Sequence, residues 1–479
     1  NTIGENHPTT LKVKSNLAKF YRVKGSYKEA ENILKTNLEL IKKKLGDNDL
    51  TTAEFQSLLA DLYLEMNLYR KAEDLYLISL ETKKELLNPQ SIDLIKIKNR
   101  IGLLYSEQGR YKEAEEILKN AFLSYQGDSK NNPIVFAAVL NNLYVVLLKQ
   151  GKLEEAKSQL LRSKNIIENS VGKKNREYIV ILSNLGITNQ RQGLYEISQL
   201  YFQEALELSK KYLGENKLIT SSIQNNIAVN YSYQNLFLEA ESYLLDALKI
   251  NKKILGNKHA KTSQISINLA YLYLLKGQEN KIEKYAYEGL KEIFNLIQKE
   301  SQYLALNNRE SFLQSLRSSY MTPFQWALDS KSGARMALFS RLNHQGLLQE
   351  IERQQAQISR QTTSQNSNIK EISKIVSQLS SNELSSELRI SLIKKKALLE
   401  RELPVIENSV VEIEQVSEVM PENSVLIEFQ KYNQIIFSDN NDSIKTKLKY
   451  LALILKPNKE IISIDLGPAD ILENKIKET

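Results

Sequence analysis

One pattern of small, aromatic and glycine positions recurs along this sequence at a constant interval of 42 residues. The position of Ala30 returns as Ala72, Ala114, Ala156, Ser198, Ala240 and Ile282. The position of Gly25 returns as Asn67, Gly109, Gly151, Gly193, Asn235 and Gly277. Self-similarity at a fixed period of this length is typical of architectures in which each copy packs only against its neighbours. Roughly the first 300 residues are therefore predicted to form a solenoid of seven copies, numbered 1 to 7 along the chain.

Each copy has the apolar spacing of two helices separated by a turn. In copy 1 the break falls at Gly25, a residue type that readily adopts the left-handed conformation that ends a helix. Small residues recur at two further positions, where the paired helices are expected to approach each other closely. The first of these positions is Ala18, Ala60, Gly102, Tyr144, Gly186, Ala228 and Ala270, and the second is Asn37, Ser79, Ala121, Ser163, Ala205, Ala247 and Gly289.

Composition excludes several classes of function. The net charge is +8, but the 65 basic and 57 acidic residues are interspersed, which is typical of solvated helices and not of a nucleic-acid-binding stripe. No cysteine is present, so disulfides, thiolate metal sites and a cysteine nucleophile are excluded within these residues. No apolar run approaches the roughly 20 residues that a membrane-spanning helix needs. The sequence begins at Asn1, partway through a repeat, so we expect a fragment whose parent could carry a signal sequence.

The order small, aromatic, Gly, Tyr-x-Glu-Ala-Glu (Ala18 to Glu31 in copy 1) resembles the tetratricopeptide repeat. The 42-residue unit, with a Gly-x-x-His-Pro-x-Thr linker at Gly4 to Thr10 and a weaker one at Gly256 to Thr262, is similar to the repeats of kinesin light chain and many bacterial relatives. The resemblance covers residues 1–298. It implies an α-solenoid whose concave side binds a protein or peptide, and a cytoplasmic, bacterial protein.

Asparagine recurs at the position that faces the inner surface of such arrays. This position reads Asn16, Leu58, Arg100, Asn142, Asn184, Asn226 and Asn268, with Asn99, Asn141 and Asn225 beside it. Asparagine forms helices poorly, so its recurrence needs a reason. Its amide offers both a donor and an acceptor, so a ladder of amides can bind an extended peptide backbone. The eight asparagines are our candidate partner-binding residues; in the alternative interpretation, the amides tie neighbouring helices together.

The period is lost after residue 298. Residues 299–403 are predicted to form a helical connector with a coiled-coil hairpin, in which a polar helix (Leu347 to Arg360) is followed by a second amphipathic run (Ile369 to Glu402). In residues 404–479 the pattern becomes strand-like. Strands are predicted at Ser424 to Tyr432, Leu448 to Leu455 and Ile461 to Leu466, with a turn between the last two and a final helix after Gly467.

The segments MPENSVLIEFQKY (Met420 to Tyr432) and YLALILKP…ISIDLGPA (Tyr450 to Ala469), after MALFSRLNHQGLLQEIERQQAQI (Met336 to Ile358), resemble the start of a CHAT domain, a caspase-like domain. Complete members are similar to cysteine peptidases with a His–Cys dyad, in which the thiolate attacks a peptide carbonyl. Here no cysteine is present, and His344 lies in the helices before the strands. The resemblance therefore assigns no catalytic residue to this chain, and any dyad would lie beyond Thr479.

The predicted fold class is mainly α: a right-handed α-solenoid of about seven helix pairs, a helical connector, and the first strands of an incomplete α/β, caspase-like domain. The predicted function is a scaffold that binds a protein or peptide in the concave groove, with no cofactor, metal, nucleic acid or membrane involved. In the alternative, the parent protein is a CHAT-type cysteine peptidase whose array recruits a substrate or regulator. The chain as it stands is not predicted to be an enzyme, and its oligomeric state is left open.

Overall fold

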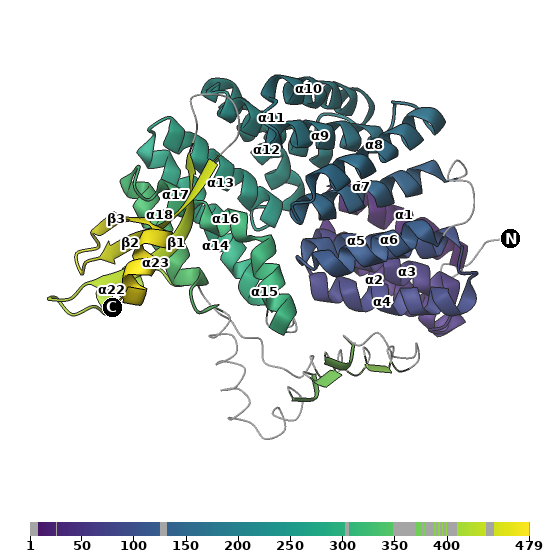
Figure 1. Ribbon diagram of the computed structural model, residues 1–479. Helices are drawn as coiled ribbons and strands as arrows, with labels where there is room; N and C mark the ends of the chain where they lie inside the picture. Colours follow the sequence, from purple (N-terminus) through teal and green to yellow (C-terminus); the bar gives the residue numbers. More distant parts are fainter. Residues whose placement is uncertain are drawn as a thin grey trace.

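The structure is a computed structural model that describes residues 8–24, 26–124, 132–301, 306–347, 410–436 and 445–478, with scattered residues between 370 and 399. Its first part is a solenoid of seven helix pairs, as predicted (Figure 1). The first helices of the pairs are α1 (Pro8–Lys24), α3 (Leu50–Glu65), α5 (Ile92–Glu107), α7 (Pro133–Lys149), α9 (Arg176–Arg191), α11 (Leu218–Tyr233) and α13 (Ala260–Leu275). The second helices are α2 (Tyr27–Leu45), α4 (Tyr69–Leu86), α6 (Tyr111–Leu123), α8 (Leu153–Ser170), α10 (Tyr195–Tyr212), α12 (Phe237–Leu255) and α14 (Glu279–Ser301).

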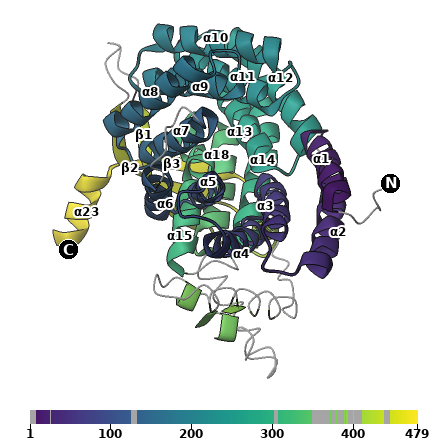
Figure 2. The same ribbon diagram turned by 90° about the vertical axis from the view of Figure 1, so that its right-hand side faces the viewer.

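The pairs curve round a central axis, with the first helices on the inner side. Figure 2 shows α7, α9 and α11 facing the centre, while α8, α10 and α12 form the outer rim. The predicted inner-surface positions therefore lie on helices that line the concave side. Among the described helices, none is both long and apolar enough to cross a membrane.

The turn inside each pair requires a left-handed residue, as the sequence predicts. Positive φ occurs at Asn67, Gly109, Gly151, Gly193, Asn235 and Gly277. The corresponding Gly25 lies outside the described residues. Asparagine is among the few non-glycine residues that tolerate this conformation, which explains why it replaces glycine in copies 2 and 6.

Small residues allow the paired helices to touch, which confirms their predicted role. A Cβ atom on Gly102 would lie 2.6 Å from the Leu118 side chain, and one on Gly186 would lie 2.5 Å from Phe202. At the second small position, Asn37, Ser79 and Ser163 donate hydrogen bonds to the backbone carbonyls of Leu11, Ala53 and Ala137, each 26 residues earlier.

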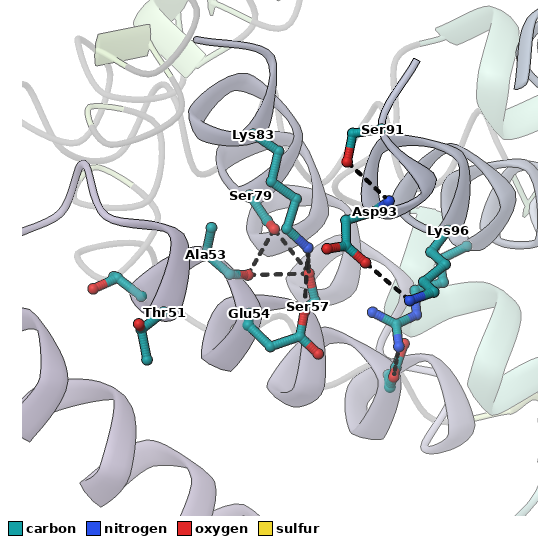
Figure 3. A network of polar contacts seen from close by, with 12 residues as sticks. Thr51, Ala53, Glu54, Ser57, Ser79, Lys83, Ser91, Asp93 and Lys96 are labelled. Carbon is teal, nitrogen blue, oxygen red and sulfur yellow. Dashed lines mark hydrogen bonds and ion pairs between the residues drawn. The ribbon is translucent and has the colours of Figure 1, made fainter. Parts of the chain in front are cut away.

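In copy 2 this bond belongs to a larger buried network (Figure 3). The Ser79 hydroxyl lies 2.6 Å from the Ala53 carbonyl and 2.8 Å from the Ser57 hydroxyl. Lys83, only 4% exposed, places its ammonium 3.4 Å from Ser57 Oγ and 3.3 Å from the Glu54 carboxylate. A buried charge is tolerated when it is paired and hydrogen-bonded, as here.

The two ends of the curve contact each other, which nothing in the period predicts. His259, at the start of α13, donates from Nε2 to the carbonyl oxygen of Glu65 at the end of α3, over 2.7 Å. The ring of Phe312, in α15 (Leu306–Ser315), is fully buried and packs edge-on against Tyr69 of α4. Copy 7 and the connector are therefore joined to copy 2. His259 also accepts a bond from the Lys261 N–H as the N-cap of α13, which confirms its predicted capping role.

Short helices and a three-stranded sheet follow the array. The helices are α16 (Arg317–Met321), α17 (Pro323–Trp326), α18 (Lys331–His344), α22 (Ile413–Glu418) and α23 (Ala469–Glu478), and the strands are β1 (Leu426–Ile436), β2 (Lys445–Leu455) and β3 (Ile461–Pro468). The strands form an antiparallel sheet in the order β1-β2-β3. The predicted polar helix of the connector lies outside the described residues beyond Leu347, and the second run is described only at separate positions, so the coiled coil stays a prediction.

The sheet has one covered and one open face. Its covered face is joined to α17 and α18 by two bonds, from Ser463 Oγ to the Ala327 carbonyl at 2.6 Å and from Arg341 to Glu428 at 2.9 Å. The open face carries Ile427, Phe429 and Ile464, which are 42–56% exposed. The fold class is thus a helical solenoid followed by a small antiparallel sheet.

The junction between copies 2 and 7 contains an acid whose pKa is strongly raised. Glu300, near the end of α14, is 5% exposed and receives backbone hydrogen bonds from Tyr69 and Arg70. Burial raises the pKa of Glu300 to about 7. Because this pKa lies above its value in the unfolded chain, the contribution of Glu300 to stability is complete below about pH 4.5 and is lost as pH rises through 7.

We predict that Glu300→Gln raises the melting temperature at pH 8, because the amide removes the cost of ionising a buried carboxyl. The gain is expected to be on the order of 1–3 kcal/mol at pH 8 and to vanish near pH 4.5. Thermal melts across this pH range measure it, with Glu116→Gln, at an exposed position, as the control. Equal shifts at both pH values would contradict the assignment.

Candidate partner-binding surface

The structure places the predicted asparagines on the inner helices and pairs most of them between copies. Asn142 Nδ2 donates to Asn99 Oδ1 over 2.9 Å, and Asn184 Nδ2 donates to Asn141 Oδ1 over 2.6 Å. Each bond joins residues 43 apart in sequence, on the first helices of adjacent copies.

The same bond occurs twice more. Asn226 Nδ2 donates to Ser183 Oγ over 3.2 Å, and Asn268 Nδ2 donates to Asn225 Oδ1 over 2.8 Å. We call these four bonds the amide seam. It ties copies 3 to 7 together, as the alternative interpretation of the asparagines expects. Asn16, on α1, is exposed and lies outside the seam.

The seam continues into copy 2 as an ion pair that sequence reasoning missed. Arg100 stands where the other copies have asparagine, and its guanidinium lies 3.2 Å from the Asp61 carboxylate of α3. Asp61 also accepts a hydrogen bond from Tyr76, at 2.6 Å. The apparent loss of the asparagine in copy 3 is therefore a change of chemistry, in which a charge pair replaces an amide pair.

The seam leaves hydrogen-bonding capacity for a ligand. A carboxamide has two N–H donors and an oxygen with two lone pairs, whereas one seam bond uses a single N–H and a single lone pair. The seam asparagines are half-buried, so their remaining groups are partly open to the groove. Structural pairing and ligand contact are therefore compatible, and the partner-binding role stays a prediction.

A row of apolar side chains runs beside the seam. It comprises the residue three positions after the asparagine position in copies 3 to 7: Leu103, Val145, Ile187, Val229 and Tyr271. Residues three apart share one face of a helix, and all five are half-buried. We call them the inner row. The sequence carried the signal, an apolar residue three positions after the asparagine position at the same period.

In copy 7 this surface is covered by the connector. Trp326 of α17 is fully buried and stacks on the Tyr271 ring, with centroids 6.1 Å apart. Ser319 of α16 donates a 2.5 Å hydrogen bond to Gln264, which in turn donates to Asn268 at the end of the seam. The predicted core role of Trp326 is confirmed, and its neighbour is an inner-row residue.

Two cations follow the inner row. Lys149 and Arg191 are exposed and lie seven residues after Asn142 and Asn184, hence on the same helical face. Burial of the surrounding surface lowers the pKa of Lys149, and the charge of Arg191 lowers it further. This mutual repulsion leaves a local excess of positive charge at the ends of α7 and α9. Among the described residues, no cluster of three or more His, Asp or Glu could hold a metal ion.

The fold defines a helical repeat protein with a concave inner face. Two matches to the tetratricopeptide repeat, over residues 9–85, 135–211, 177–253 and 219–291 and over residues 94–126, together cover more than half of the chain. The chain belongs to the tetratricopeptide-repeat family. Among curated proteins, none matches the sequence.

Several solved structures share the repeat fold at low identity. BtubC (BKLC) from P. vanneervenii is 20% identical, with 51% of this chain and 92% of that chain covered and a TM-score of 0.37. A putative kinesin light chain of Podosopora anserina is 18% identical, with 44% and 98% covered and a TM-score of 0.36. A Rap protein complexed with competence and sporulation factor is 15% identical, with 72% and 96% covered and a TM-score of 0.46.

We predict that the seam bond between Asn141 and Asn184 contributes measurable coupling. In a double-mutant cycle of Asn141→Ala and Asn184→Ala, the interaction energy is expected to be about 0.5–1.5 kcal/mol, the net value of one hydrogen bond. Urea denaturation measures each variant. The unbonded pair Asn16→Ala and Asn184→Ala should be additive, and additivity in both cycles would show that the seam bond contributes nothing to stability.

Proposed function

We propose that the chain is a scaffold that binds a peptide or protein segment along the inner face of copies 3 to 6. Tetratricopeptide repeats generally mediate protein–protein interaction, which supports the class of function. The observation that carries the proposal is internal to the molecule. In copy 7 the inner row and the seam are already covered by a segment of the chain itself, through Trp326 and Ser319. The equivalent surface therefore recurs in copies 3 to 6 with the same phase.

The chemistry of this surface indicates the chemistry of its ligand. The inner row of copies 3 to 6 is aliphatic, so it suits apolar side chains of the partner. The seam amides of Asn142, Asn184 and Asn226 suit backbone or amide groups beside them. Lys149 and Arg191 favour a carboxylate at one end of the groove, and that charge would fix the direction in which the ligand lies.

We propose the domain division 1–298 for the array, 299–403 for the connector and 404–479 for the start of a CHAT-type α/β domain. The order α22, β1, β2, β3 and α23 supports it, since these elements follow the predicted sequence of strands and helix. The open sheet face with exposed Ile427 and Phe429 is also consistent with a domain that has a further layer.

A second candidate concerns the parent protein. If the CHAT assignment holds, the array would recruit a substrate or regulator for a caspase-like cysteine peptidase. The chain itself holds no cysteine and so supplies no nucleophile of that kind.

The groove proposal is tested with peptide ligands selected from a display library on the full chain. Selected peptides are expected to combine apolar residues with a carboxylate. The double variant Lys149→Glu/Arg191→Glu should weaken their binding at least tenfold in fluorescence anisotropy, because the complementary charge is reversed. Replacement of Asn184, Asn226 and Asn268 by Ala should also weaken binding.

The matched control is Lys112→Glu, an exposed lysine on the outer helix α6. Circular dichroism checks that each variant keeps its helical content. If the charge-reversed variant binds the selected peptides as tightly as the control does, the groove is not the binding surface.

The CHAT assignment is tested by the sequence of the parent gene downstream of Thr479. A histidine followed by a cysteine, each directly after an apolar strand, is the expected result for the peptidase. Further strands without this pair would support a CHAT-like scaffold that lacks catalysis. An unrelated domain there would refute the assignment.

A further inference from the structure

Helix α1 presents an apolar face that is open to solvent. Val13 is 64% exposed, Leu17 is 46% exposed and Phe20 is 50% exposed. Their spacing of four and three residues places them on one side of the helix. Isolated exposed apolar residues are normal on a protein surface, but an aligned set marks a contact surface. We call these three residues the α1 face.

The same three positions are buried in every other copy. They are Phe55, Ile97, Val139, Ile181, Ile223 and Ile265 for the first, Leu59, Ile101, Leu143, Leu185, Ile227 and Leu269 for the second, and Leu62, Leu104, Val146, Thr188, Asn230 and Leu272 for the third. None of these eighteen side chains is more than 4% exposed. The α1 face is therefore the stacking surface of the solenoid in the one copy where it is not covered.

The structure also shows what covers this surface elsewhere. In copy 2 it is buried against α2, the second helix of the preceding pair, whose Leu34, Leu38 and Ile41 share one apolar cluster with Phe55 and Leu59. The covering residues have the same spacing of four and three as the surface they cover. The matching element is thus an amphipathic helix with a stripe of aliphatic residues.

Charge narrows the choice of helix. The sequence of α1 has four lysines and one arginine and no acidic residue, whereas that of α3 has Glu54, Asp61 and Glu65 and no basic residue. The acidic α3 is covered by α2, whose last turn carries three lysines. By the same complementarity, the basic α1 suits an acidic helix. A second copy of α1 would instead bring two basic helices together.

We propose that the α1 face is a docking surface for an acidic amphipathic helix of a partner protein, seated as α2 is seated on α3. The interaction is separate from the inner groove, because the three residues lie on the stacking side of the array and not on the inner row. The apolar stripe supplies the contact area, and the charges favour the acidic partner and add to the rate of association. Binding is therefore expected to weaken as salt increases.

The test uses a synthetic helix as the probe. A fluorescent peptide with the sequence of residues 27–45, carrying K42E, K43E and K44E, is titrated with the full chain. Saturable binding is expected, with at least a tenfold loss in the chain variant Leu17→Glu/Phe20→Glu. Both residues are exposed, so these substitutions should leave the fold intact, as circular dichroism can check.

The controls separate this surface from the alternatives. Leu238→Glu, at a residue that is 75% exposed on α12, should bind the probe normally, as should the groove variant Lys149→Glu/Arg191→Glu. The peptide with its native lysines should bind at least tenfold more weakly than the acidic one. Failure of the acidic peptide to bind, or equal binding by the Leu17→Glu/Phe20→Glu variant, overturns the proposal.

Two further results would reassign the α1 face. Light scattering that shows a dimer of the full chain, converted to a monomer by Leu17→Glu/Phe20→Glu, would identify a second copy as the occupant. Binding of phosphatidylserine vesicles that depends on the same residues, without binding of the acidic peptide, would identify a membrane surface. Either result overturns the proposed protein partner.

Discussion

The stacking of each first helix on the second helix of the preceding copy is the contact on which the rest of the structure depends. A single helix pair has too little apolar surface to form its own core, so the copies are stable only as neighbours. Residues such as Phe55, Leu59 and Leu62 are buried only because α2 precedes them. Every insertion or deletion would move these residues off the stacking face. A spacing of 42 residues, kept through seven copies, is the sequence-level consequence.

Stacking alone leaves the curvature of the array free to vary, and two other sets of contacts restrict it. The amide seam links neighbouring copies on the concave side, where the inner helices are closest to one another. The contacts of His259 with Glu65 and of Phe312 with Tyr69 join copy 7 and the connector to copy 2. The first set acts between adjacent copies and the second set closes the curve. Together they give the inner face a fixed shape, and a preformed surface loses less entropy when it binds a ligand.

Most of the fold could be predicted because it repeats. Asn67 and Asn235 could be assigned to left-handed turns by their phase alone, and the alternation of apolar residues indicated all three strands. The predicted first strand ends at Tyr432, whereas β1 continues to Ile436, because its pairing with β2 extends further than its own apolar pattern. The closure of the curve could not be predicted, since Phe312 and His259 contact residues roughly two hundred positions away and belong to no recurring set.

The candidate site was predicted in position but not in mechanism, because one amide group serves two purposes. The recurrence of Asn142, Asn184, Asn226 and Asn268 indicates a common environment, and a hydrogen bond to the next copy satisfies that indication as well as a ligand does. The inner row distinguishes the two cases better than the asparagines do. A seam that served only stability would need no apolar row beside it, whereas a binding groove needs contact area as well as polar groups. The covering of Tyr271 by Trp326 shows that this row is able to bury a large side chain. The aliphatic members of copies 3 to 6 are therefore the residues on which the proposed recognition of a partner depends.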